Sequence, residues 1–179
     1  MKYYAIRTND QVAVNNLINN NAQGFSIDYL SWYQNEVAIN DIVFIKISGD
    51  DAKKNYGYDN ALKAIGKIAS LPYNIHIPAG RSTNHYTIDI VVDIIFNNVI
   101  TANDLYIYPE VLNSMSIGAS TKGMPNQAIG QLNSDNKGEY LIKALINLGH
   151  LDNKNNQILN HFGIIGNQLQ KCTINTIGV

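Results

Sequence analysis

The chain contains a single cysteine, Cys172, so it can form neither an internal disulfide nor a zinc site built from cysteines. Charged residues are also scarce: they make up 15% of the 179 residues, whereas a typical globular protein has roughly 25%. The net charge of −1 gives no overall electrostatic attraction to nucleic acid. A nucleic-acid function would therefore need a local group of basic side chains, unless these charges only solubilise the surface. The candidates for such a group are Lys53, Lys54, Lys63, Lys67, Arg81 and Lys122.

Long apolar runs are absent as well. No run approaches the ~20 residues that a membrane-spanning helix needs, and the N-terminus has no signal-peptide pattern. The sequence therefore predicts a soluble, cytoplasmic protein that makes no membrane contact. Its length suits one domain with a sizeable core.

The common catalytic motifs are missing too. The sequence has no Walker-type lysine motif, no GxGxxG and no G-x-S-x-G elbow. Asp89 and Asp93 would share one face of a strand, but acids in that position are more often solvent-facing. A zinc site built from His76, His85 and Asp89 is conceivable, although ordinary polar loop histidines explain the pattern better. We therefore expect no metal, no cofactor and no catalytic residue in this chain.

Two apolar segments carry the strongest structural signal. The polar pair Asn40-Asp41 opens into the apolar run 42–48, and the β-branched run 64–69 has Gly66 inside it. Both runs are typical of core strands, and a polar insert separates them. An aromatic patch, Tyr29-Leu30-Ser31-Trp32-Tyr33, precedes both. Together these features indicate a pocket-bearing β-barrel that binds a planar ligand.

The rest of the pattern places further elements around these strands. Asn9-Asp10 supplies a cap for a short amphipathic helix that runs toward Asn19. Residues 25–33 are expected to be irregular, Asn97-Asn98 to form a turn, and residues 139–148 to form a second amphipathic helix. The expected extended segments are residues 2–8, 42–48, 62–70, 87–96 and 104–109. The expected loops are residues 49–58, 74–86 and 116–127.

The opening segment Met1-Lys2-Tyr3-Tyr4-Ala5-Ile6-Arg7 resembles the start of EVE domains, which belong with YTH domains to the PUA-like superfamily. Those proteins continue with a glycine–aromatic pair, a G-D-hydrophobic strand and an I-G-hydrophobic strand that ends near a proline. The counterparts here are Gly24-Phe25, Asn40-Asp41-Ile42-Val43-Phe44 and Ile65-Gly66 through Pro72, in the same order over roughly the first 75 residues. Two positions depart from the pattern: Phe25 stands where many EVE proteins have tryptophan, and Asn40 replaces a glycine.

A second similarity lies further along the chain. Tyr108-Pro109-Glu110 and the segment Gly123-Met124-Pro125-Asn126-Gln127-Ala128-Ile129 resemble the end of N-terminal modules on McrB-type restriction GTPases. This chain has no motor motif, so the resemblance implies only the recognition module of such a modification-dependent system. Any GTPase or nuclease activity would then lie on other domains or subunits, with which this chain would be fused or associated.

The resemblance implies an α+β fold, a small PUA-like β-barrel of roughly five to seven strands flanked by short helices. Residues 1–150 would form this recognition barrel. Residues 151–179 would be a C-terminal extension, either part of the same domain or the start of a linker. The implied function is non-catalytic: the domain would bind DNA and hold a modified, most simply methylated, base that has been flipped out of the duplex.

PUA-like modules of this type hold the modified base in an aromatic cage. The resemblance places Trp32 in one wall, with Phe25 or Tyr33 in another, and Ser31 and Asn126 as partners for the base edge. Trp32 and Phe25 are equally compatible with the apolar core, and Asn126 with a turn beside Pro125. The residues expected to contact phosphates are Lys53, Lys54, Arg81 and Lys122.

Other functions stay open on the sequence alone. A PUA-like domain could bind RNA or a nucleotide, or act as an enzyme on a small ligand with Asp89, Asp93 or His85 in a polar cleft. A related barrel could recognise unmodified DNA through the major groove, although the near-neutral charge favours a pocket. An interaction domain whose aromatic residues are all core is the remaining alternative.

Overall fold

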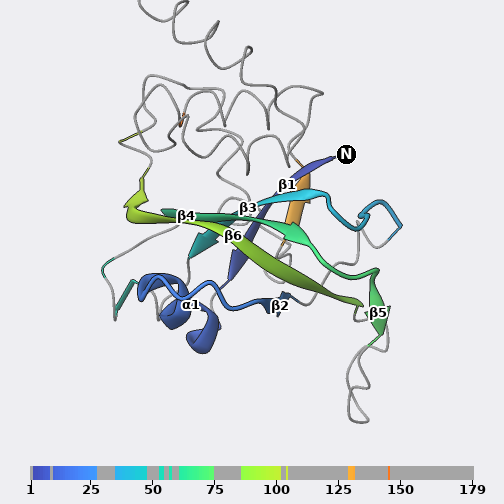
Figure 1. Ribbon diagram of the computed structural model, residues 1–179, viewed down its shortest axis with the longest axis horizontal. Coiled ribbons are helices and arrows are strands. Elements are labelled where there is room, and N and C mark those ends of the chain that lie inside the picture. Colours follow the sequence, from blue (N-terminus) through green and yellow to red (C-terminus); the bar gives the residue numbers. More distant parts are fainter. Residues whose placement is uncertain are drawn as a thin grey trace, which may run out of the picture.

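The computed structural model describes residues 2–8, 10–27, 35–47, 53–54, 57, 61–74, 86–101, 104, 129–131 and 145. Within this part of the chain, seven strands form one curled sheet, and one short helix lies against a face of it (Figure 1). The elements are β1 (Tyr3–Thr8), α1 (Gln11–Ile18), β2 (Phe25–Ile27), β3 (Ile42–Ile47), β4 (Ala61–Ile68), β5 (Tyr73–Asn74), β6 (Tyr86–Ile100) and β7 (Ile129–Gln131).

The strand order across the sheet is β2-β6-β4-β3-β1-β7, and β5 pairs with one end of β6. Only the β1–β3 pair is parallel among the strands described; β3–β4, β4–β6, β2–β6 and β1–β7 are antiparallel. The parallel pair needs a crossover, and α1 lies on that connection between β1 and β3.

The core lies between α1 and the sheet. Val14 and Leu17 of the helix join Tyr4, Ile45 and Ile90 in one cluster of buried side chains. The opposite face of the central strands is closed as well, because every residue of β3 and β4 is buried. A strand that is buried on both faces needs a continuous apolar run rather than an alternating one. This requirement explains the run that begins at Ile42.

The residues that resemble EVE domains occupy positions where the backbone conformation or its close packing restricts which residue types can fit. Asn40 has a φ of 72°, in the left-handed region that asparagine tolerates better than most residues with a side chain, so it can replace a glycine there. A β-carbon at Gly66 would lie 2.1 Å from the carbonyl oxygen of Val91, and one at Gly24 would lie 2.8 Å from that of Ile90. The motif therefore preserves the fold, whatever the domain binds.

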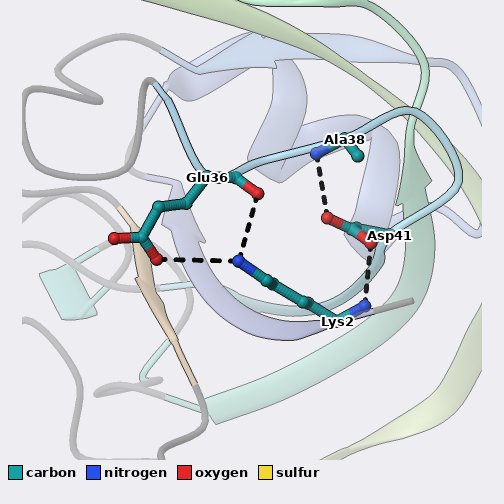
Figure 2. A network of polar contacts seen from close by, with 4 residues as sticks. All are labelled: Lys2, Glu36, Ala38 and Asp41. Carbon is teal, nitrogen blue, oxygen red and sulfur yellow. Dashed lines mark hydrogen bonds and ion pairs between the residues drawn. The ribbon is translucent and has the colours of Figure 1, made fainter.

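Asp41 holds the start of β1 against the turn that leads into β3 (Figure 2). Its carboxylate accepts hydrogen bonds from the backbone N–H of Lys2, at 2.8 Å, and from that of Ala38, at 2.9 Å. The Lys2 ammonium lies 3.8 Å from a carboxylate oxygen of Glu36. A polar pair thus precedes the apolar run because its acid fixes the register of β1 beside β3.

Most of the local predictions are confirmed. Strand β1 and strand β3 match the expected segments 2–8 and 42–48, and β4 matches 62–70 to within two residues. Asp10 is the N-cap of α1: its Oδ1 accepts a hydrogen bond from the Ala13 N–H at 2.9 Å. Of the predicted helix 139–148, only Leu145 is among the described residues; it has helical backbone and is fully buried.

Several local predictions were wrong. Lys53 and Lys54, expected in a loop, have helical backbone, and Asp104, expected in an extended segment, lies in a turn. Residues 25–27 are not irregular but form β2, which pairs with β6. Asn97 and Asn98 do not turn the chain, because β6 continues through them to Ile100. The register between β4 and β6 shifts here, and the Lys63 ammonium donates hydrogen bonds to the carbonyl oxygens of Phe96 and Asn97. A lysine from the neighbouring strand thus satisfies carbonyl groups that the shifted ladder leaves without a strand partner.

Candidate nucleic-acid interface

Three of the predicted interface residues lie in the part of the chain that the structure describes. Phe25 opens β2 opposite Ile90 of β6, is partly buried and packs against the core cluster. Its ring therefore has a structural role, and its role in a base pocket stays a prediction. Lys53 and Lys54 are both exposed, so their ammonium groups are accessible to solvent. The predicted residues outside the described ranges are Ser31, Trp32, Tyr33, Arg81, Lys122 and Asn126.

Two other basic candidates, Lys63 and Lys67, are neither phosphate contacts nor solubilising charges, because both are buried. Burial lowers the pKa of Lys63, whose ammonium is bound to β6 carbonyl groups. The Lys67 ammonium lies 3.9 Å from Oδ2 of Asp93. Burial raises the pKa of Asp93, and the Lys67 charge opposes this only in part. Both lysines therefore have their partners on β6, inside the sheet.

A third lysine, Lys46, is fully buried on β3, and the sequence analysis did not single it out. Burial, with a smaller contribution from the charge of Arg7, lowers its pKa to about 7. Arg7 is its partner in the register of β1 and β3. Within the described residues, basic side chains are therefore concentrated inside the sheet as much as on its surface.

A polar cluster surrounds Asp89 where β2, β5 and β6 meet. Oδ1 of Asp89 accepts hydrogen bonds from the Ser26 hydroxyl, at 2.7 Å, and from the Tyr73 hydroxyl, at 2.8 Å. The Asp89 N–H donates to Oγ of Ser70 at 2.9 Å, and the Ala69 N–H donates to the Asp89 carbonyl oxygen at 2.8 Å. The cluster is solvent-accessible and presents a carboxylate held in one orientation.

The sequence analysis named Asp89 but missed Ser26, Ser70 and Tyr73. These residues have no common sequence signature, because strand pairing alone brings them to Asp89: Ser26 lies opposite it across β2–β6, and Tyr73 reaches it from β5. Asp93, the other acid predicted on this face, contacts Lys67 rather than the cluster. The carboxylates therefore have separate partners.

No group of three or more histidine, cysteine, aspartate or glutamate side chains in the described residues could hold a metal ion. His76 and His85, the predicted partners of Asp89 in a zinc site, lie outside these ranges. No helix in the described part of the chain is long and apolar enough to cross a membrane.

Comparison with known proteins identifies the fold. No family model and no curated protein matches the sequence. Among solved structures, the DUF55 domain of human thymocyte nuclear protein 1 superposes with a TM-score of 0.52 at 11% identity, over 78% of this chain and 96% of that one. The same human protein in complex with DNA containing 5-methylcytosine gives 0.51 at 10% identity, over 79% and 96%. A protein of Rhodopseudomonas palustris gives 0.52 at 14% identity, over 80% and 92%.

These similarities confirm the predicted fold class, a small PUA-like β-barrel with a short helix. At identities of 10% to 14% these similarities show the fold alone. The three glycine and asparagine positions described above explain how so few shared residues can specify one fold. Backbone geometry restricts the residue at those positions.

Proposed function

We propose that this chain is a non-catalytic DNA-recognition domain that holds a modified base in a pocket. The observation that carries the proposal is the complex of a structural neighbour with DNA containing 5-methylcytosine, because this chain shares the fold over 96% of that protein. The exposed Lys53 and Lys54 and the solvent-accessible cluster at Asp89 are compatible with such a role. In this proposal the domain serves a modification-dependent restriction system, with a GTPase motor and a nuclease on other domains or subunits.

The base pocket would form next to β2. In that strand Phe25 and Ile27 face the core while Ser26 is exposed, and the chain then continues directly into the segment that carries Ser31, Trp32 and Tyr33. Trp32 would be the main stacking surface, with Tyr33 or the exposed part of Phe25 as the second wall. The partners for the base edge would be Ser31 and Asn126.

The energetics suit an aromatic pocket with few charges. Flipping a base costs a few kcal/mol in lost pairing and stacking. Stacking on an aromatic side chain contributes about 1–3 kcal/mol per base, and an apolar wall can accommodate a methyl group. Contacts from Lys53, Lys54, Arg81 and Lys122 to phosphates would supply the remaining, sequence-independent affinity. A net charge of −1 then limits binding to unmodified DNA.

The proposal is tested by measuring binding of short duplexes that are unmodified, methylated at cytosine or methylated at adenine. The wild type is compared with Trp32→Ala and with the control Val12→Ala, which truncates an exposed side chain on α1. We expect the wild type and the control to prefer one methylated duplex, and Trp32→Ala to lose about 5- to 150-fold in affinity for it, as loss of about 1–3 kcal/mol of stacking predicts. Equal binding to all three duplexes would instead indicate recognition of the groove or backbone.

RNA is the alternative ligand for the same pocket. A matched single-stranded RNA, with and without methylated adenine, belongs in the panel. Tighter binding to the methylated RNA than to every duplex would assign the domain to RNA and overturn the DNA proposal.

A further inference from the structure

Among the described residues, hydrogen bonds account for only one of the two carboxylate oxygens of Asp89. Its carboxylate uses only Oδ1 for the Ser26 and Tyr73 hydroxyls, and Oδ2 has no hydrogen-bond partner in the part of the chain that the structure describes. We propose that Asp89 Oδ2 accepts a hydrogen bond from the exocyclic amino group of the bound base, and so selects cytosine or adenine over thymine. This inference rests on the proposed function and extends it to the choice of base.

The geometry favours a ligand that donates a hydrogen bond. A carboxylate only accepts, and two hydroxyl donors from different strands fix its rotation. The backbone is held as well, because the Asp89 N–H and carbonyl oxygen are bound to Ser70 and Ala69. The free oxygen is therefore pre-oriented and loses little conformational entropy when a donor binds.

The surrounding surface favours a neutral base over a phosphate. Val91, two residues further along β6, is 46% exposed although its strand is central, and Tyr73 is 43% exposed. Asp93, beyond Val91, pairs with Lys67 and adds no free acid to this surface. The Asp89 carboxylate disfavours a phosphate, and the apolar surface beside it suits the flat ring and amino group of a base.

The sequence connects the cluster to the segments proposed to form the pocket and to contact phosphate. Ser26 is six residues before Trp32, and Tyr73 lies on β5, eight residues before Arg81. A base stacked on Trp32 would have its pairing edge free, since flipping breaks its Watson–Crick bonds. Aspartate accepts from N4 of cytosine in known recognition patterns, and N6 of adenine is an equivalent donor. Thymine has an acceptor, O4, at that position.

The test compares the affinities for two duplexes that differ at one base opposite guanine, either 5-methylcytosine or thymine. Both bases carry the methyl group. At the pairing edge, thymine replaces the N4 amino donor by the O4 acceptor and the N3 acceptor by an N3–H donor. We expect Asp89→Asn, whose amide can donate to O4, to lower the ratio of 5-methylcytosine to thymine affinity by about 5- to 150-fold, since one base contact gives ~1–3 kcal/mol of discrimination. The easier flipping of a mismatched thymine cancels when the ratios of the two proteins are compared.

Two further variants keep the result interpretable. Asp104→Asn is the matched control, because that carboxylate accepts from the backbone N–H and the hydroxyl of Thr101 at an exposed turn outside the cluster. The double variant Ser26→Ala with Tyr73→Phe leaves the carboxylate in place and removes its two hydroxyl donors. We expect it to lower the same ratio by a smaller factor, which gives a second measurement should Asp89→Asn fail to fold.

The outcomes separate this inference from the proposed function. A ratio that falls in Asp89→Asn and stays at the wild-type value in Asp104→Asn supports the role of Asp89. An unchanged ratio, with methyl-dependent binding and the effect of Trp32→Ala intact, overturns the role of Asp89 and leaves the proposed function standing. Absence of binding by the wild type to every duplex overturns both.

Discussion

At the scale of single residues, the most unusual feature of the described part of the chain is a set of three buried lysines. Lys46, Lys63 and Lys67 are all buried in the sheet, and each has a different electrostatic environment. Lys63 donates to backbone carbonyl groups, Lys67 faces Asp93, and Lys46 lies beside Arg7. Burial lowers the pKa of Lys46 and of Lys63, so these two lysines make the stability of the domain depend on pH.

Lys46→Met should reduce that dependence. The pKa of Lys46 is about 7 in the folded protein and near 10.5 in the unfolded chain, so the unfolded state binds more protons between these two values. The free energy of unfolding therefore rises with pH across this window, and a single group contributes a slope of up to about 1.4 kcal/mol per pH unit. We expect the urea midpoint of the wild type to rise from pH 7 to pH 9.5, and that of Lys46→Met to rise less.

The matched control is Lys53→Met, which removes an exposed lysine and should keep the wild-type slope. A remaining slope in Lys46→Met is expected, because the pKa of Lys63 is also lowered by burial. Identical slopes for wild type and Lys46→Met would show that Lys46 is not held uncharged by the fold.

At the scale of elements, the correct predictions concern helices and strands that are determined by residues close together in the sequence. The strand that begins at Ile42, the strand at β1 and the Asp10 cap were predicted from local patterns, and all three are confirmed. The errors concern elements that depend on distant partners. Strand β2 exists because it pairs with β6, and β6 passes through Asn97 because Lys63 satisfies the carbonyl groups there.

Gly66→Ala tests the close packing of the central strands. A β-carbon at that position would lie 2.1 Å from the Val91 carbonyl oxygen, which is backbone and cannot move aside without disturbing β6. We expect a loss of about 2–4 kcal/mol in the free energy of unfolding, or failure to fold. The control is Gly57→Ala, where a β-carbon meets no atom of the described residues within 4 Å and the positive φ of 73° opposes the substitution, at about 1–2 kcal/mol. Equal losses at the two positions would contradict the packing argument.

At the scale of the whole molecule, the residues that determine the fold differ from those that form the candidate site. Backbone requirements at Gly24, Asn40 and Gly66 explain why a PUA-like fold could be predicted from weak motifs. The site could not be predicted to the same degree, since the Asp89 cluster is assembled from separate segments with no shared pattern. The roles of Trp32 and Asn126 stay predictions.

The salt dependence of DNA binding tests how the molecule holds the duplex. Each ammonium that neutralises a phosphate contributes about 0.9 to the slope of log affinity against log salt concentration. Because Lys53 and Lys54 are exposed and proposed to contact phosphates, the double variant with alanine should lower this slope by about 1–2. We expect the preference for the modified duplex to be unchanged. A loss of preference at unchanged slope would place these lysines at the base rather than at the backbone.

The most direct test of base flipping is the fluorescence of 2-aminopurine placed next to the modified base. Stacking in the duplex quenches this analogue, and removal of the neighbouring base from the stack relieves the quenching. If the domain flips a methylated base, wild-type protein should raise the fluorescence of the methylated duplex and leave that of the unmodified duplex nearly unchanged. Tight, methyl-dependent binding with no rise in fluorescence would contradict the account, because the base would then be recognised within the helix.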